Sequence, residues 1–446
     1  MNSISSHKSS KLSGEIIVPG DKSISHRALI IGSLVTGKIK IKNLLESDDV
    51  IATLEALKTL NIKIKKNKNI WEVFGNGIGN LSGTNYRLDL GNSGTGSRLL
   101  MGLIAGSDVE ATIIGDESLS KRPMKRIIKP LMKTGAVFDD PNNNNLPIKI
   151  KGSKIPIPLE YNSPVASAQI KSSILLTGLS STGNTTIIEP SLSRDHSERM
   201  LKYLGAKIST TQLPNSSWKI TLEGLPILKP LDIEIPSDPS SASFPLVASI
   251  ITPGSEIKIL NVCVNNLRTG LYKTLIDMGA NIIFSNRREI NGEPIADISA
   301  KYSILRGIKI PKLRVASMID EFPILSIAAV RAIGQTTMEG IEELRFKETD
   351  RIHAMSEGLN SAGIETKEKK DSLVINGKGP DYSINGDISI NSRLDHRIAM
   401  SFLCLGLITE NPIRVTDTDT IKSSFPSFFE IMNKIGAKLK HTQTHK

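Results

Sequence analysis

The sequence predicts an α/β protein made of two similar domains, and three observations support this prediction. Apolar β-like runs alternate along the chain with amphipathic helical segments, which is typical of α/β layering. One short phrase recurs six times. Six equal units in a chain of 446 residues would hold about 75 residues each, which is long for a solenoid repeat and short for an independent domain. Three units in each of two domains is therefore the simplest arrangement.

The recurring phrase consists of a helix end, a Gly or Asn residue, and a short β-like run. The middle residue can take the left-handed conformation that ends a helix, and it is Asn61 in the first copy and Gly in the others. The copies span residues 57–62, 131–136, 201–206, 275–280, 359–364 and 432–437. Because the phrase returns in register, it indicates internal repeats.

The elements within a unit follow one order. In the first copy the sequence predicts a strand, a helix, a second strand and a second helix, followed by a last strand. The first four of these elements span residues 15–18, 23–34, 39–43 and 47–60. The fourth copy repeats the order, with a strand at 233–236, a helix through 244–250, a strand at 257–261 and a helix that ends at 278.

The composition is that of a globular protein, with 39% hydrophobic and 23% charged residues. The longest apolar run, residues 398–408, is much shorter than the ~20 residues that span a bilayer. No secretory signal is recognised, and two cysteines cannot form a disulfide framework. We therefore expect a cytoplasmic protein that does not enter a membrane.

The net charge of +11 has several possible meanings. It could serve nucleic acid, an anionic membrane or anionic small molecules, or it could be a lysine-rich solvated surface. An aromatic content of 4% leaves few platforms on which the bases of a single strand could stack. The positions of the cations must therefore decide between these classes.

The informative polar residues lie at the predicted helix N-termini, where free backbone N–H groups and the positive end of the dipole suit an anion. First-helix starts lie at residues 20–27, 91–98, 167–169, 318–321 and 394–397, and second-helix starts at 119–123, 193–196 and 347–351. Cations there oppose the dipole at a cost of roughly 0.3–1 kcal/mol each. Lys347 and Arg351 are in addition like charges four residues apart. A bound anion explains such placements, whereas any one of them could also be solvated surface charge.

Two carboxylates stand beside these predicted anion sites. Asp320 and Glu348 are placed where a general acid or base would be needed, and the alternative for each is a helix cap. Residues 91–96 have the glycine spacing of a phosphate-binding loop, but Ser97 stands where its lysine should be. The histidines and cysteines form no ligand cluster, so no metal site is predicted.

Two adjacent Asp-His pairs are weak candidates for acid–base catalysis. They are Asp195-His196 and Asp395-His396, and neighbours in sequence on a helix do not face each other. The two cysteines, at positions 263 and 404, lie in apolar runs and are predicted to be core thiols.

Several motifs together resemble the 5-enolpyruvylshikimate-3-phosphate synthase family of enolpyruvyl transferases. They are Gly20-Asp21-Lys22-Ser23 with His26-Arg27, Asn92 with Gly94-Thr95, Lys121-Arg122-Pro123-Met124, Ser167-Ala168-Gln169, Glu342 with Leu344, Lys347-Glu348 and Asp350-Arg351, and Asp395-His396-Arg397 with Ala399-Met400. The resemblance covers the chain from Gly14 to Ala437 in the order of the family.

The resemblance implies an α/β (α+β) fold with six internal repeats, as two domains of three βαβαββ units. The first domain would hold residues 21–238 and the second residues 1–20 with 239–446, and the active site would lie in the cleft between them. It implies transfer of the enolpyruvyl group of phosphoenolpyruvate to the 5-hydroxyl of 3-phosphoshikimate, in aromatic amino-acid biosynthesis through chorismate. No cofactor, metal, nucleic acid or membrane would take part, the protein would be a monomer, and glyphosate would be an inhibitor.

The resemblance also assigns roles to residues. The proposed ligands of 3-phosphoshikimate are Lys22, Ser23, Arg27, Ser167, Ala168, Gln169, Arg194, Asp320 and Lys347. Those of phosphoenolpyruvate are Lys22, Gly94, Arg122, Gln169, Arg351 and Arg397. Asp320 would take the proton of the attacking hydroxyl, and Glu348, helped by Lys22, would protonate the methylene carbon.

One position departs from the family pattern. Many members have a lysine two residues before a Phe-Pro near the C-terminus, where this chain has Ser423, and the side chain of the adjacent Lys422 would project about 100° away on a helix.

The alternative functions are that of the sister enzyme, which acts on UDP-N-acetylglucosamine, and that of a basic nucleic-acid-binding protein. The sister enzyme normally carries a reactive cysteine in the loop that here spans residues 116–121, which has none.

Overall fold

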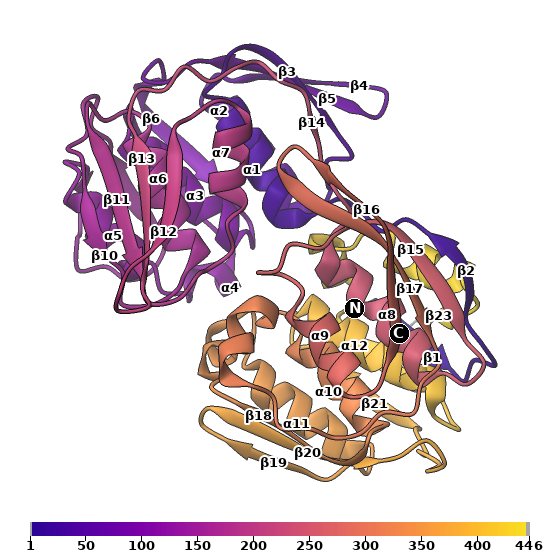
Figure 1. The fold of residues 1–446 in the computed structure, drawn as a ribbon. Helices are drawn as coiled ribbons and strands as arrows, with labels where there is room; N and C mark the ends of the chain where they lie inside the picture. Colours follow the sequence, from indigo (N-terminus) through magenta and orange to yellow (C-terminus); the bar gives the residue numbers. More distant parts are fainter. Residues whose placement is uncertain (1, 443–446) are drawn as a thin grey trace. The chain divides into compact units, whose positions relative to one another are not determined.

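The computed structural model describes residues 2–442 and confirms an α/β architecture built from repeats. The chain divides into two compact units (Figure 1). The first unit is Gly20–Ile235 with Glu289–Glu293, and the second is Met1–Pro19, Pro236–Arg288 and Pro294–Lys446. The strands of the described residues form six sheets, three in each unit, which is one for each predicted repeat.

The first unit has a buried set of helices and a more exposed set. The buried helices are α1 (Lys22–Gly32), α3 (Gly94–Ala105) and α6 (Ala168–Gly178), and the others are α2 (Asp48–Thr59), α4 (Glu117–Ser120), α5 (Lys125–Met132) and α7 (His196–Tyr203). Its sheets have the strand orders β14 (Ile233–Glu234), β3 (Thr36–Lys42), β5 (Ile70–Asn76), β4 (Lys63–Asn67); β6 (Ser82–Asp89), β7 (Asp108–Ile114), β9 (Ile148–Lys151), β8 (Val137–Phe138); and β10 (Glu160–Asn162), β11 (Asn184–Glu189), β13 (Trp218–Glu223), β12 (Ile208–Gln212).

Helices α3 and α6 pack closely because glycines remove side chains from their interface. A Cβ atom on Gly102 would lie 2.3 Å from the Ser173 carbonyl oxygen, and one on Gly106 would lie 2.9 Å from that of Thr177. Thr177 Oγ1 also donates a hydrogen bond to the Gly102 carbonyl at 2.8 Å. This close approach fixes the N-terminus of α3 beside that of α6, where several predicted ligands lie.

The second unit repeats this plan. Its buried helices are α8 (Pro239–Ile251), α10 (Phe322–Val330) and α12 (His396–Leu405), accompanied by α9 (Gly270–Asp277), α11 (Arg351–Ser361), α13 (Phe428–Lys434) and the 3₁₀ helices η1 (Lys312–Met318), η2 (Glu342–Phe346), η3 (Gly406–Ile408) and η4 (Thr418–Ser423). Its sheets have the orders β21 (Ile388–Asn391), β22 (Ile413–Thr416), β1 (Ser3–His7), β23 (Lys438–Thr442); β16 (Asn281–Ile290), β17 (Glu293–Lys301), β15 (Glu256–Cys263), β2 (Ser13–Ile16); and β18 (Ile333–Glu339), β20 (Ser372–Lys378), β19 (Thr366–Lys369).

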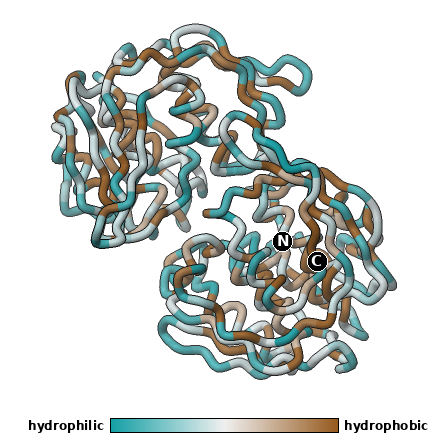
Figure 2. The backbone as a smooth tube through the Cα atoms, viewed as in Figure 1, coloured by the Kyte–Doolittle hydropathy of each residue, from teal (hydrophilic) through white to brown (hydrophobic). Residues whose placement is uncertain are grey.

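Apolar stretches recur along the chain in both units, in keeping with the repeat (Figure 2). All thirteen residues of α8 and all nine of α10 are buried, so both helices are enclosed on every side, although α8 includes serines such as Ser243 and Ser249. Among residues 2–442, no helix combines the length and the apolar character needed to cross a membrane.

The recurring helix-end phrase has the backbone conformation that the sequence predicts. The middle residue has a positive φ in each copy: +65° at Asn61, +99° at Gly135, +100° at Gly205, +101° at Gly279, +78° at Gly363 and +106° at Gly436. Each of these residues follows a helix, as a left-handed C-terminal cap requires.

The first strands of the first and fourth repeats exchange places. Strand β2 pairs in parallel with β15, with Ile16 opposite Ile259, so it completes a sheet of the second unit. Strand β14 pairs in parallel with β3, with Ile233 opposite Ile41, so it completes a sheet of the first unit. The predicted strands at 15–18 and 233–236 thus form, shifted or shortened, although their sheets could not be read from local pattern.

Candidate active site

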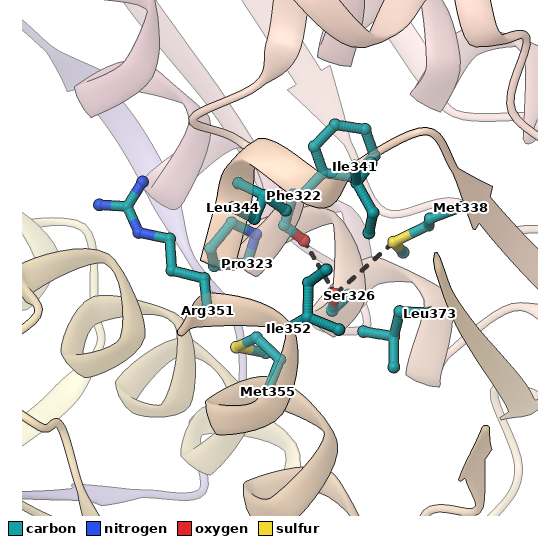
Figure 3. A pocket seen from close by; sticks show the side chains of 10 residues that line it. All are labelled: Phe322, Pro323, Ser326, Met338, Ile341, Leu344, Arg351, Ile352, Met355 and Leu373. Atoms are coloured by element: carbon teal, nitrogen blue, oxygen red, sulfur yellow. Dashed lines mark hydrogen bonds between the residues drawn. The ribbon is translucent and has the colours of Figure 1, made fainter. Parts of the chain in front are cut away.

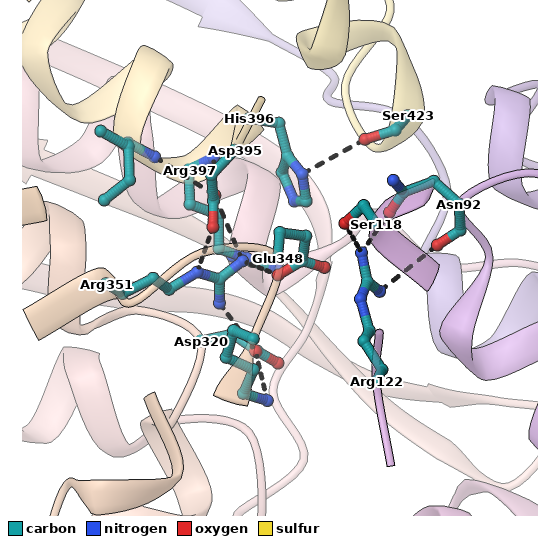
Figure 4. A network of polar contacts seen from close by, with 12 residues as sticks. Asn92, Ser118, Arg122, Asp320, Glu348, Arg351, Asp395, His396, Arg397 and Ser423 are labelled. Atoms are coloured by element: carbon teal, nitrogen blue, oxygen red, sulfur yellow. Dashed lines mark hydrogen bonds and ion pairs between the residues drawn. The ribbon is translucent and has the colours of Figure 1, made fainter. Parts of the chain in front are cut away.

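A buried guanidinium lies at the centre of a carboxylate cluster in the second unit (Figure 4). Arg351, the first residue of α11, is 1% exposed. Its Nε donates to Asp395 Oδ2 at 2.8 Å, its Nη2 to Glu348 Oε2 at 2.5 Å, and its Nη1 to Asp320 Oδ1 at 3.4 Å. Burial alone would lower the pKa of Arg351, but Asp395, Glu348 and Asp320 outweigh it and raise the pKa. Arg351 is therefore a permanent cation.

The stem of Arg351 lines a small, mostly apolar cavity with residues such as Phe322, Leu344 and Met355. Figure 3 shows the guanidinium pointing away from these apolar side chains. The apolar lining offers no partner to a charged head, so the stem packs while the head meets the carboxylates.

Asp320 Oδ1 receives a second cation. Lys347 Nζ donates to it at 3.2 Å, in addition to the Arg351 contact. Residues 2–442 contain no group of three or more His, Cys, Asp or Glu side chains placed to hold a metal ion. The carboxylates of this cluster instead share the charges of Arg351 and Lys347, which fixes the direction of the Asp320 carboxylate.

Asp395 connects the starts of α11 and α12. Its Oδ1 accepts from the backbone N–H of Arg397 at 2.9 Å, while both oxygens accept from Arg351. This cap holds Arg397 next to the cluster, and Arg397 Nη1 lies 3.8 Å from Glu321 Oε1. At the position that departs from the family pattern, Ser423 Oγ hydrogen-bonds His396 Nδ1 at 3.2 Å.

Lys422, the neighbour of Ser423, lies on the surface. Its Nζ is 3.2 Å from Asp419 Oδ1, and more than half of its side chain is exposed. The structure therefore gives Lys422 a surface ion pair of the kind that contributes little to stability.

In the first unit, a second buried arginine lies one turn into α1. Arg27 donates to Ser197 Oγ, Ser172 Oγ and the Ser23 carbonyl, each at 2.8 Å. Burial lowers the pKa of Arg27 to about 10, although Glu198 acts in the opposite direction. Because this value lies well above neutral pH, Arg27 remains a cation.

The other predicted cation of α1, Lys22, is the first residue of the helix and forms an ion pair with Asp49 of α2. Asp21 caps the helix by accepting from the Ile24 backbone N–H at 2.8 Å. The helix therefore begins with a capped turn whose lysine is oriented by a carboxylate of the same unit.

The starts of α3 and α6 meet through Arg98. Its Nη1 donates to Gln169 Oε1 at 2.9 Å, and Gln169 Nε2 donates to Thr95 Oγ1 at 3.1 Å. The amide of Gln169 is therefore held at both ends. Ser167 caps α6 by accepting from the Ile170 N–H at 3.5 Å, and Ala168 is the first residue of that helix.

Arg122 lies against the bare backbone at the start of α3. It donates to Ser118 Oγ at 3.1 Å and to the Asn92 carbonyl at 3.3 Å, and its Nη2 also contacts the Asn92 side chain (Figure 4). A Cβ atom on Gly94 would lie 3.2 Å from Arg122 Nη1. The glycine thus leaves room beside the guanidinium.

The structure brings the predicted residues together in three groups. Gly94, Arg122 and Gln169 lie around the starts of α3 and α6; Ser23 and Arg27 lie along α1; and Asp320, Lys347, Glu348 and Arg351 form the carboxylate cluster of the second unit. Arg194, which precedes α7, is close enough to Arg27 for its charge to help lower the pKa of Arg27.

Sequence reasoning missed the residues that orient these ligands. Arg98 lies one helical turn after Gly94, and Asp49 lies in the first turn of α2. The sequence places Asp395 at a predicted helix start, in a family motif and in an adjacent Asp-His pair. Its contact with Arg351 could not be predicted, although an Asp directly before a helix is a capping signal.

The two adjacent Asp-His pairs have other partners. Asp195 Oδ2 accepts from Arg199 Nε at 2.8 Å, and His196 Nδ1 bonds Glu293 Oε1 at 2.7 Å. In the second pair, Asp395 binds Arg351 and its histidine binds Ser423, as described above. These contacts favour structural roles for both histidines.

Comparisons with known proteins agree on one family. The sequence profile of EPSP synthase (3-phosphoshikimate 1-carboxyvinyltransferase) matches residues 6–432. A 3-phosphoshikimate 1-carboxyvinyltransferase of Parvibaculum lavamentivorans is 48% identical over 437 residues, which are 98% of this chain and 96% of that protein. The solved structure of an EPSP synthase from Acinetobacter baumannii is 41% identical and has a TM-score of 0.88, covering 99% of this chain and 100% of that one. The enolpyruvyl transferase NikO from Streptomyces tendae, at 16% identity and a TM-score of 0.78 over 99% of both chains, shares the fold.

Proposed function

Because the chain belongs to the EPSP synthase family, we propose that it transfers the enolpyruvyl group of phosphoenolpyruvate to the 5-hydroxyl of 3-phosphoshikimate and releases phosphate. This reaction belongs to the biosynthesis of aromatic amino acids through chorismate. The observation that carries the proposal is the contact of one buried guanidinium, that of Arg351, with both Asp320 and Glu348. This contact supports the proposal, because a cation suited to an anionic substrate lies beside two carboxylates of the kind that transfer protons.

The charges support two anionic substrates, each with a carboxylate and a phosphate. Guanidinium groups bind such groups in a forked geometry, and the arginines held in place by neighbouring polar groups suit that role. We assign phosphoenolpyruvate to Lys22, Gly94, Arg122, Gln169, Arg351 and Arg397, and 3-phosphoshikimate to Lys22, Ser23, Arg27, Ser167, Ala168, Gln169, Arg194, Asp320 and Lys347.

The reaction proceeds by addition and then elimination. The 5-hydroxyl oxygen attacks C2 of phosphoenolpyruvate while Asp320 accepts its proton, and Glu348, helped by Lys22, donates a proton to C3. When the substrate carboxylate takes hydrogen bonds from Arg351, it competes with Glu348 for the guanidinium and so frees Glu348 for proton transfer. In the second step Glu348, now a carboxylate, takes a proton from C3, the bond from C2 to the phosphate oxygen breaks with its electron pair leaving on phosphate, and the enolpyruvyl double bond forms again.

We also propose a cellular location, an oligomeric state and an inhibitor for this protein. Cys263 and Cys404 are buried and form no disulfide, which fits the reducing cytoplasm. We propose that the protein acts there as a monomer and that glyphosate inhibits it at the phosphoenolpyruvate subsite. Light scattering of the purified protein tests whether it is a monomer, and a dimer at micromolar concentration would contradict that proposal.

The assay that tests the function compares acceptors. Purified protein is mixed with phosphoenolpyruvate and either 3-phosphoshikimate or UDP-N-acetylglucosamine, and phosphate release is followed together with the mass of the product. We expect one phosphate and one enolpyruvyl ether for each 3-phosphoshikimate consumed. Turnover of the nucleotide sugar alone would favour the sister enzyme, while tight, salt-dependent binding of DNA or RNA without turnover would favour a nucleic-acid-binding protein.

A further inference from the structure

Three buried charges in the first unit have no role in the mechanism above. Lys171 of α6 is 1% exposed, and its Nζ lies 2.9 Å from Glu189 Oε1 and 2.7 Å from Glu198 Oε1. Glu189 ends β11, and Glu198 lies in the first turn of α7. Apolar side chains of similar volume often stabilise a fold as well as a buried ion pair does. Stability alone therefore does not explain why these three charged side chains are buried together.

Lys171 keeps its charge, although burial raises the pKa of its partner Glu198 despite the opposing effect of Lys171. Burial alone would lower the pKa of Lys171, but Glu198 and Glu189 outweigh it and raise that pKa. A buried lysine that keeps its proton and contacts two elements besides its own is a rigid connection between α6, β11 and α7.

Lys171 and Glu189 together hold the polar groups of Ser193. The Ser193 backbone N–H donates to Glu189 Oε1 at 2.8 Å, and its Oγ donates to Glu189 Oε2 at 2.7 Å. Lys171 Nζ donates to the Ser193 carbonyl at 3.2 Å. That carbonyl belongs to the peptide bond that joins Ser193 to Arg194, so the cluster fixes the direction in which the chain enters Arg194.

Helix α6 also holds Arg27, another of the residues assigned to 3-phosphoshikimate. Ser172, the neighbour of Lys171, accepts from Arg27 Nη2 at 2.8 Å and bonds Ser197 Oγ at 2.7 Å. The charge of Arg194 helps to lower the pKa of Arg27, so the two guanidinium groups are close enough to repel each other. Two cations kept close by a rigid support are suited to a shared dianion.

We propose that Lys171 and Glu189 are positioning residues for 3-phosphoshikimate, which hold Ser193 so that Arg194 and Arg27 converge on the phosphate of the substrate. Both side chains are buried and act through Ser193 rather than on the substrate. The inference rests on the proposed function, because it assumes that 3-phosphoshikimate is the acceptor.

The test is a double-mutant cycle read out by steady-state kinetics and calorimetry. Glu189→Gln should raise KM and Kd for 3-phosphoshikimate about tenfold, the effect of losing one charge-assisted hydrogen bond. The KM for phosphoenolpyruvate and kcat should stay within about twofold, since Arg194 acts on one substrate only. In an Arg194→Ala background, Glu189→Gln should add nothing, because the residue that it positions is gone.

Two further variants make the test decisive. Ser193→Ala removes only the bond from Oγ to Glu189, so it should raise KM for 3-phosphoshikimate a few-fold, again only when Arg194 is present, even if Glu189→Gln folds poorly. Glu110→Gln, which removes one partner of Lys149 at 3.0 Å in the same unit, is the matched control and should leave all constants unchanged.

Two outcomes would overturn the positioning role. One is an effect of Glu189→Gln and Ser193→Ala that persists in full without Arg194. The other is a loss of kcat with both KM values unchanged, as a merely structural defect would give. The unmodified protein distinguishes failure of the positioning role from failure of the proposed function. If it neither binds nor converts 3-phosphoshikimate, both proposals fail. If turnover is normal but the effects of Glu189→Gln and Arg194→Ala are additive, only the positioning role is rejected.

Discussion

A single methyl group at Gly94 should weaken the binding of glyphosate, the inhibitor proposed above, more than that of the substrate phosphoenolpyruvate. A Cβ atom there would lie 3.1 Å from Arg98 Nη1 and 3.2 Å from Arg122 Nη1. Both distances are shorter than ordinary van der Waals contact, at about 3.5–4 Å. The methyl group would therefore displace two guanidinium groups by a few tenths of an ångström, and one of these groups orients Gln169.

The size of the effect follows from overpacking. Crowding a tight site costs about 1–3 kcal/mol, which is about fivefold to more than a hundredfold in affinity. Because both arginine side chains can move, we expect the lower part of this range, about tenfold, for glyphosate. Phosphoenolpyruvate is shorter and leaves more room at this wall, so its KM should rise less than threefold. The fold should tolerate the change, since Ala is favoured over Gly within a helix by about 1 kcal/mol.

The assay measures initial rates of phosphate release at several concentrations of phosphoenolpyruvate and glyphosate. Gly183→Ala is the matched control, because its Cβ would lie 3.0 Å from Pro158 Cγ, in the segment that follows the C-terminal end of α6. We expect it to leave both constants unchanged. Equal rises in the inhibition constant and in KM for Gly94→Ala would mean that position 94 does not line the subsite as proposed.

Three further predictions concern catalysis, metals and pH. Asp320→Asn should lower kcat by about 10²–10⁴-fold, the usual share of general-base catalysis, while calorimetry shows a much smaller change in Kd for 3-phosphoshikimate; equal losses would argue against Asp320 as the base. Exhaustive EDTA treatment should leave turnover unchanged, because residues 2–442 offer no cluster of metal ligands; activity lost with EDTA and restored by a divalent ion would contradict this. Burial, helped by the charges of Lys22 and Arg27, lowers the pKa of His26 well below its usual 6.5, so the unfolded chain takes up a proton that the folded chain does not. The free energy of unfolding should therefore fall below pH 6.5, by up to about 1.4 kcal/mol per pH unit, and thermal unfolding of His26→Asn should show a weaker pH dependence; parallel curves would be evidence against this origin.

Local signals account for what could be predicted from the sequence. The six helix-end residues have positive φ because a left-handed cap depends on one residue and its immediate neighbours. Helix starts that could bind anions could be predicted for the same reason, since the free N–H groups are a property of any helix. Lys22, Gly94 and Arg351 each begin a helix in the structure.

What could not be predicted depends on contacts between distant parts of the chain. Asp395 binds Arg351 across 44 residues, and no spacing in the sequence reports this bond. Lys171 and Glu189 are charged residues of kinds that are almost never fully buried unless paired, yet both are buried, where they form an ion pair. Strand β1 was missed because Ser3–His7 has no alternating apolar pattern.

The place of β1 in its sheet sets an order for the folding of a newly made chain. It lies between β22 and β23, with Ser3 opposite both Thr416 and Thr442, so a strand made before β2 to β21 pairs only with two strands made after them. At about 5–20 residues per second, this wait lasts on the order of 20–90 s. An apolar strand left open for that time would tend to pair with other chains. The serine-rich sequence of β1 suits a segment that must remain in water until β22 and β23 have been made.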